Sequence, residues 1–147
     1  MAKVSTYLNF DGQTEEAFEF YKKVFKTSFV GELQRMESVP AQPGMKELSD
    51  AEKKRVMHVA LPITGGHVLM GTDTLPSMGH RLEVGNNMYI TLEPDTREEA
   101  DELFASLSEG GKVEMQLQEM FWGDYFGSFQ DRYGINWMIN CSEKKAA

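Results

Sequence analysis

The chain has 147 residues, of which 41% are hydrophobic and 26% are charged, the size and composition of one globular domain with a buried core. Its formal net charge of -8 argues against a nucleic-acid partner, because phosphate binding needs a basic face. The same charge argues against attraction to an anionic membrane surface, and no apolar run is long enough to span a bilayer. The single cysteine, Cys141, can form no internal disulfide, so a cytoplasmic location is expected.

The first half of the chain predicts a strand, a helix and three further strands. Residues 7–10 read as a strand, and an Asp-Gly turn leads into an amphipathic helix over 14–25, with Thr14 as its expected N-cap. The three later strands are expected at 29–36, 55–63 and 67–73, the last two joined by a glycine hairpin at 64–66.

Two polar segments interrupt this pattern. Residues 37–54 form a long insertion, in which Ser49 is expected to cap a short helix over 50–54. Residues 74–86 form a connector that contains Pro76 and two glycines. Both segments are therefore predicted to be loops between elements of the sheet.

The second half of the chain repeats the order of the first half. A strand at 89–92 precedes a helix over 96–107, for which Thr96 is the expected N-cap. Strand-like segments then follow at 112–120, 124–131 and 135–140. The sequence therefore predicts an α+β fold of two βαβββ modules, 1–73 and 87–141, within a single domain of residues 1–147.

Alternation along the strands assigns their two faces. Leu8, Val59 and Leu61 should meet the helices, as should Trp137 in the last strand. The opposite face carries hydroxyl, amide, imidazole and aromatic groups rather than a uniform set of charges, which indicates a surface that encloses a ligand. The residues expected to line that binding surface are Tyr7, Asn9, His58, Tyr89, Thr91, Trp122, Asn136 and Met138.

Three segments together resemble a known family. They are YLNFDGQTEEAFEFYKKVF (7–25), VMHVALPITGGHVLMGTD (56–73) and WGDYFGSFQDRYGINWMIN (122–140). The chain resembles the PhnB-like branch of the vicinal oxygen chelate superfamily, which includes glyoxalase I, extradiol dioxygenases and bleomycin resistance proteins. The resemblance implies the glyoxalase/bleomycin resistance fold, in which two modules form a cup-shaped, barrel-like mixed sheet, usually in a homodimer.

The resemblance also indicates where a metal would bind. Metal-dependent members use His, Glu or Gln side chains from the first and last strand of each module. At the corresponding positions this chain offers Tyr7 or Asn9, Met70 or its neighbours, Asn87 or Tyr89, and Met138. These are poor ligands for a divalent transition metal, so no metal cofactor is expected. The alternative is a divalent metal at a degenerate site formed by His58 and Asp73.

Some members of this branch are described as methyltransferases, and the sequence does not favour that activity. It contains no glycine-rich strand-to-helix turn followed by an acidic residue that would hold an adenosyl cofactor.

His58 is the one catalytic candidate, because a lone imidazole on the cleft face can act as a general base near neutral pH. The alternative is a structural histidine that hydrogen-bonds to a neighbouring tyrosine or carbonyl. Asp73 similarly suits either a ligand at the cleft rim or the cap of a turn.

The first functional hypothesis is metal-free binding of a small organic molecule. The second is a glyoxalase-type lyase, isomerase or dioxygenase, and the third is a dimeric interaction module. In each case a homodimer is expected, because each module leaves sheet edges to be covered.

Overall fold

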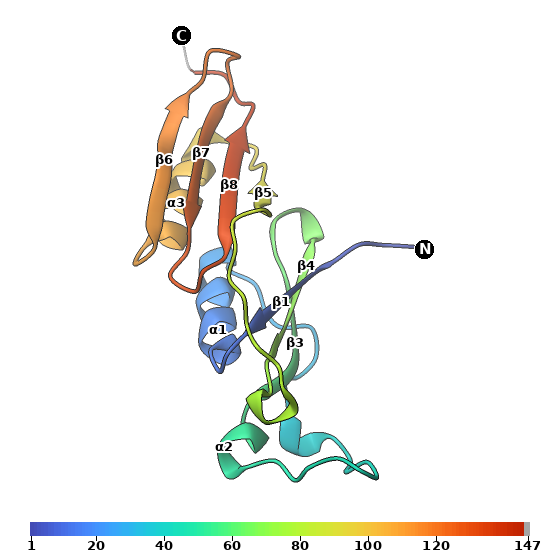
Figure 1. Cartoon of the computed structure of the whole chain (residues 1–147). Helices are drawn as coiled ribbons and strands as arrows, with labels where there is room; N and C mark the ends of the chain where they lie inside the picture. Colours follow the sequence, from blue (N-terminus) through green and yellow to red (C-terminus); the bar gives the residue numbers. More distant parts are fainter. Residues whose placement is uncertain (146–147) are drawn as a thin grey trace. The chain divides into compact units, whose positions relative to one another are not determined.

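The computed structural model describes residues 1–145 and shows an α+β fold made of two βαβββ modules (Figure 1). The chain divides into two compact units, with the boundary between Glu83 and Val84. Each unit holds one four-stranded mixed sheet and one long helix. Within the described residues no helix combines the length and the apolar character needed to cross a bilayer.

The first unit follows the predicted order of elements. These elements are β1 (Thr6–Phe10), α1 (Thr14–Phe25), β2 (Gln34–Arg35), a 3-10 turn (Met36–Ser38), α2 (Asp50–Lys53), β3 (Val56–Pro62), a turn at Thr64–Gly66, β4 (Val68–Asp73) and a 3-10 turn at Pro76–Met78. The strands lie in the order β1-β4-β3-β2, and β1 runs parallel to β4 while β3 runs antiparallel to it. Strand β1 therefore forms one edge of the sheet and pairs with β4, a strand that is distant from it in sequence.

Helix α1 packs on one face of this sheet because its apolar side chains match a hollow in β4. Ala17, Phe18 and Tyr21 of α1 are fully buried. Phe18 lies directly over Gly71, where an added Cβ would stand 2.4 Å from the phenyl ring. Val59 and Leu61, on the same face as Gly71, are also buried. The strand alternation predicted from sequence is confirmed here.

The second unit repeats this arrangement. It contains β5 (Ile90–Leu92), α3 (Arg97–Ser108), β6 (Lys112–Glu119), β7 (Tyr125–Gln130) and β8 (Asn136–Cys141), in the sheet order β5-β8-β7-β6. Phe104 of α3 lies over Gly127, at 2.8 Å from the position of an added Cβ. Trp137 and Ile139 are fully buried on the helix side, as the alternation predicts.

The strand predicted at 29–36 is too long, since only Gln34–Arg35 pairs with β3. Gly31 has a φ of 72°, a left-handed conformation that interrupts an extended strand. Val30 is 60% exposed and forms a single backbone bond, from its N–H to the carbonyl of Ala60. The apolar residues of this segment thus lie mostly in a loop.

The cap predicted for α1 is also wrong, whereas two others are confirmed. The N-cap of α1 is Gln13, and the hydroxyl of Thr14 donates instead to Asp73. Thr96 accepts a hydrogen bond from the N–H of Glu99, and Ser49 accepts one from Glu52. Helix α2 ends at Lys53, one residue earlier than predicted.

Candidate functional site

The face of the first sheet that points away from α1, called the far face here, carries the Tyr7–His58 pair. The Tyr7 hydroxyl and Nδ1 of His58 are 3.1 Å apart, and their ring centroids are 5.9 Å apart. Tyr7 is 50% exposed, and burial of the remainder raises the pKa of its hydroxyl. The hydroxyl therefore stays protonated at neutral pH and is available for hydrogen bonding.

Asn9 stands on the same face, two residues along β1, opposite Thr72 of β4. Both residues border a cleft of about 480 Å³ within the first unit. The connector after β4 lines its other side. The further lining residues are Met36, Asp73, Thr74, Leu75, His80, Arg81, Leu82 and Glu83. The volume suits a small organic molecule, since ligand pockets usually measure about 300–1,000 Å³.

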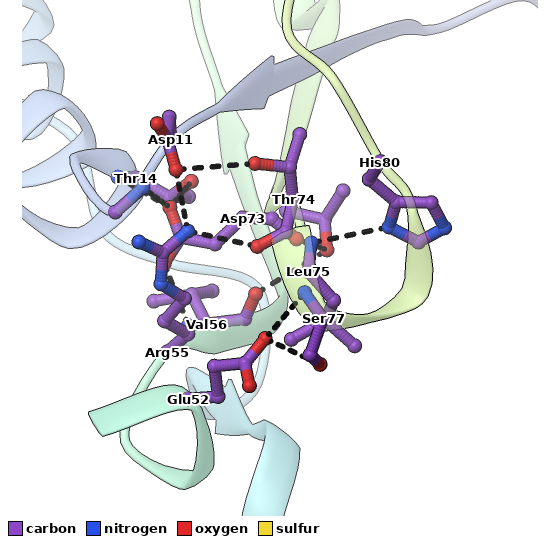
Figure 2. A network of polar contacts seen from close by, with 12 residues as sticks. Asp11, Thr14, Glu52, Arg55, Val56, Asp73, Thr74, Leu75, Ser77 and His80 are labelled. Carbon is purple, nitrogen blue, oxygen red and sulfur yellow. Dashed lines mark hydrogen bonds and ion pairs between the residues drawn. The ribbon is translucent and has the colours of Figure 1, made fainter. Parts of the chain in front are cut away.

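Asp73 has a structural role at the end of β4 (Figure 2). One carboxylate oxygen accepts hydrogen bonds from the backbone N–H of Gly12 at 3.0 Å and of Thr14 at 3.1 Å, and from the Thr14 hydroxyl at 2.7 Å. The other oxygen accepts from the N–H of Val56 at 2.8 Å. Asp73 is 4% exposed, so this carboxylate joins the starts of α1 and β3 to the end of β4.

Charged side chains surround this junction (Figure 2). Arg55 donates to a carboxylate oxygen of Asp11 at 2.7 Å and to the carbonyl of Thr74 at 2.9 Å. The hydrogen bond from Arg55 lowers the pKa of Asp11. Glu52 accepts from the hydroxyl of Ser77 at 2.8 Å, which lowers the pKa of Glu52. These contacts fasten the connector that forms one wall of the cleft.

The predicted binding residues of the second unit have varied surroundings. Thr91 and Met138 are register partners on the face of the second sheet that points away from α3. The side-chain amide of Asn136 donates to the carbonyls of Gly85 and Met88, so this buried residue fixes the segment before β5. Tyr89 donates to the Glu114 carboxylate at 2.8 Å, which raises the pKa of the tyrosine.

Trp122 lies in the turn between β6 and β7 and is 48% exposed. Its ring packs edge-on against Phe121, at 4.9 Å between centroids, and lies 6.3 Å from Phe126. The aromatic residues of this turn therefore form a small cluster of their own.

The positions that correspond to the metal ligands of the metal-dependent members carry phenol, amide and thioether side chains in this chain. Tyr7, Asn9, Met70, Tyr89 and Met138 supply no imidazole and no carboxylate. In the part of the chain that the structure describes, no three His, Cys, Asp or Glu side chains are grouped so that they could hold a metal ion. His58 and Asp73, the alternative metal ligands, lie on different sides of the first sheet. The Asp73 carboxylate faces α1, whereas His58 stands on the far face.

Most residues of the cleft wall are not among those predicted from the sequence. Thr72 could have been found, because it follows Met70 by two residues on the same strand face. His80 is exposed and also borders the cleft. No periodic signal marks Arg81, Leu82 and Glu83, since they belong to an irregular connector.

Two βαβββ modules with the strand order 1-4-3-2 define the glyoxalase/bleomycin resistance fold. A family model described as 3-demethylubiquinone-9 3-methyltransferase matches residues 2–140. The chain therefore belongs to that family, the PhnB-like branch of the vicinal oxygen chelate superfamily.

Relatives support this membership along nearly the whole chain. Protein YjdN of Escherichia coli K12 is 30% identical over 149 residues, which is 93% of each chain. The solved structure of protein PA1353 from Pseudomonas aeruginosa is 33% identical, with a TM-score of 0.81, and covers 96% of this chain and 98% of its own. A PhnB protein from Bacillus cereus is 25% identical, with a TM-score of 0.74 and coverages of 95% and 99%.

Proposed function

We propose that this protein binds a small organic molecule without a metal, in the cleft of the first unit. The observation that carries the proposal is the cleft of about 480 Å³, which Asn9 and Thr72 border from the far face. An amide and a hydroxyl beside apolar Met36 and Leu75 provide both hydrogen bonds and a surface for a carbon skeleton. Tyr7 and His58 lie on the same face and form a second polar group.

Metal-free binding is supported by the chemistry of the available side chains. A degenerate site of His58 and Asp73 would need both side chains to reach one ion. The Asp73 oxygens accept four hydrogen bonds from the N–H and O–H groups of the α1 and β3 starts. Moving that carboxylate to a metal would leave the buried donors of Thr14 and Val56 unsatisfied, at a cost of about 1–3 kcal/mol each.

Methyl transfer, which the family description names, forms no part of the proposal. The sequence offers no glycine-rich turn between a strand and a helix for an adenosyl cofactor. We also infer a cytoplasmic location and a homodimer; the unpaired and buried Cys141 supports the former.

The test is a thermal-shift screen of small metabolites, followed by calorimetric titration of the hits. We expect at least one compound to raise the melting temperature, because a ligand that binds only the native state stabilises it. The Asn9→Ala variant should weaken binding of the hit about tenfold. The matched control is Asn86→Ala, an exposed asparagine outside the cleft, which should bind normally.

A metal assay tests the second half of the proposal. Purified protein should contain far less than one Zn, Ni, Fe or Mn per chain, and millimolar divalent metal should leave the melting temperature unchanged. Near-stoichiometric metal that is lost in the His58→Ala variant would overturn metal-free binding and favour the lyase or dioxygenase hypothesis.

A further inference from the structure

Arg81 stands apart from the other arginines of the chain. Arg35, Arg55 and Arg97 form ion pairs with Glu15, Asp11 and Glu119. Arg132 donates to the carbonyl of Glu109. Within residues 1–145, the guanidinium of Arg81 has neither a hydrogen bond nor an ion pair, and Arg81 borders the cleft. Its five N–H donors are therefore available to a ligand.

His80, next to Arg81, adds a second hydrogen-bond donor, and the hydrogen bond to its ring shows which nitrogen carries the proton. The backbone N–H of Leu75 donates to Nδ1 of His80 at 3.1 Å (Figure 2). An accepting Nδ1 carries no proton in the neutral ring, so the proton must be on Nε2. The neutral imidazole thus offers an N–H group beside the guanidinium, and both residues border the cleft.

The acidic groups at the cleft do not neutralise Arg81. The Asp73 carboxylate is buried and accepts four hydrogen bonds from Gly12, Thr14 and Val56. Glu83 also borders the cleft, yet no ion pair joins it to Arg81 in the described chain. Because Glu83 forms no ion pair with Arg81, the guanidinium can bind one carboxylate of a ligand. The negative charge of Glu83 would repel a second carboxylate on the same ligand.

From this arrangement we infer that the cleft takes a small monocarboxylate, with the carboxylate at Arg81 and the carbon skeleton against Met36, Leu75 and Leu82. A guanidinium binds a carboxylate through two parallel hydrogen bonds, which gives both affinity and orientation. The inference rests on the proposed function and adds the ligand class to it.

Three probes with six carbons test the inference: hexanoate, hexanamide and adipate. Their dissociation constants are measured by NMR titration of the ¹⁵N-labelled full chain at low salt. Hexanoate should bind about tenfold more tightly than hexanamide, because the charge-assisted bonds require the carboxylate. Hexanoate should also bind more tightly than adipate, and the Glu83→Gln variant should narrow that second difference.

Arg81→Gln is the decisive variant, and Lys23→Gln removes the same charge from an exposed site on α1. We expect Arg81→Gln to reduce hexanoate binding about tenfold, to the level of hexanamide, and to weaken hexanamide binding much less. Lys23→Gln should leave both unchanged. Equal binding of acid and amide, or equal losses in Arg81→Gln, would overturn the monocarboxylate class while leaving the cleft as a binding site. If neither these probes nor any compound of the metabolite screen binds, the proposed function fails, and the ligand class fails with it.

Discussion

The buried Asp73 carboxylate accepts four hydrogen bonds at the end of β4. Its four hydrogen bonds come from residues 12 and 14, at the start of α1, and from residue 56, at the start of β3. An amide at this position would turn an NH₂ group toward some of the same donors. We therefore expect Asp73→Asn to lower the free energy of unfolding by about 2–4 kcal/mol, measured by urea denaturation.

The matched control for this variant is Asp95→Asn, an exposed aspartate in the turn before α3. It should change the free energy of unfolding by no more than about 0.5 kcal/mol. Equal effects of the two substitutions would show that the Asp73 junction does not hold the first unit together.

Asp11 gives a prediction for the dependence of stability on pH. Its pKa is lowered in the folded protein, chiefly by the hydrogen bond from Arg55. A lowered pKa means that the ionised form stabilises the fold above the unfolded value of about 3.9, and that this contribution is lost as the pH falls through the folded value. Wild type should therefore exceed Asp11→Asn in stability at about pH 6, with the difference shrinking toward about pH 3.

Chemical denaturation at several pH values measures this difference. In an Arg55→Gln background the partner of Asp11 is missing, so Asp11→Asn should change stability little at any pH. A difference between wild type and Asp11→Asn that stays constant from neutral to acid pH would contradict the assignment.

At the scale of elements, helix and sheet are matched through a single glycine in each unit. Gly71 leaves space for Phe18, whose ring would stand 2.4 Å from an added Cβ. Gly71→Ala should therefore displace α1 and lower the free energy of unfolding by about 1–3 kcal/mol in thermal or chemical denaturation. Gly85→Ala is the control, since its Cβ would meet only Asn87, at 3.7 Å.

A second substitution separates crowding from other effects of Gly71→Ala. Phe18→Leu removes the ring that collides with the new methyl group. The double variant should be more stable than the sum of the two single effects allows, which is a favourable coupling between contacting sites. Strict additivity would mean that Phe18 is not the source of the strain.

The elements that the sequence predicts well are those with a regular period. Both long helices and seven of the eight strands begin and end within two residues of their predicted bounds, because buried stripes and alternation mark them directly. The predicted bounds of β2 are too wide. Phe29 and Val30 are apolar like strand residues, and the sequence does not show that Gly31 adopts a left-handed conformation. Thr14 and Thr96 have the same local signature, yet the distant Asp73 takes the hydroxyl of Thr14. Local rules cannot anticipate such a partner.

The candidate site was less predictable for the same reason. Strand parity placed Tyr7, Asn9 and His58 on one face, and the structure joins Tyr7 to His58. The opposite wall of the cleft comes from the connector, where no period exists. Its position depends on contacts such as Ser77 with Glu52, and 25 residues separate that pair along the chain.

At the scale of the whole molecule, the expected homodimer can be tested directly. Strand β6 forms one edge of its sheet, and seven of its eight residues are exposed. Exposed strand edges are usually covered or blunted, which favours a partner subunit. Light scattering coupled to size-exclusion chromatography should give a mass twice that of the 16.7 kDa chain. A concentration-independent monomer would contradict the expectation.

The parallel pairing of β1 with β4 also has a consequence for synthesis on the ribosome. Gly12, just after β1, and Asp73, at the end of β4, are 61 residues apart. At a translation rate of about 5–20 residues per second, β1 must wait for roughly 3–12 seconds before its partner exists. The β3–β4 hairpin can close within microseconds of emerging, because its turn is local. Strand β1 is thus made first but joins the edge of the sheet last. It stays unpaired in the nascent chain until β4 leaves the exit tunnel.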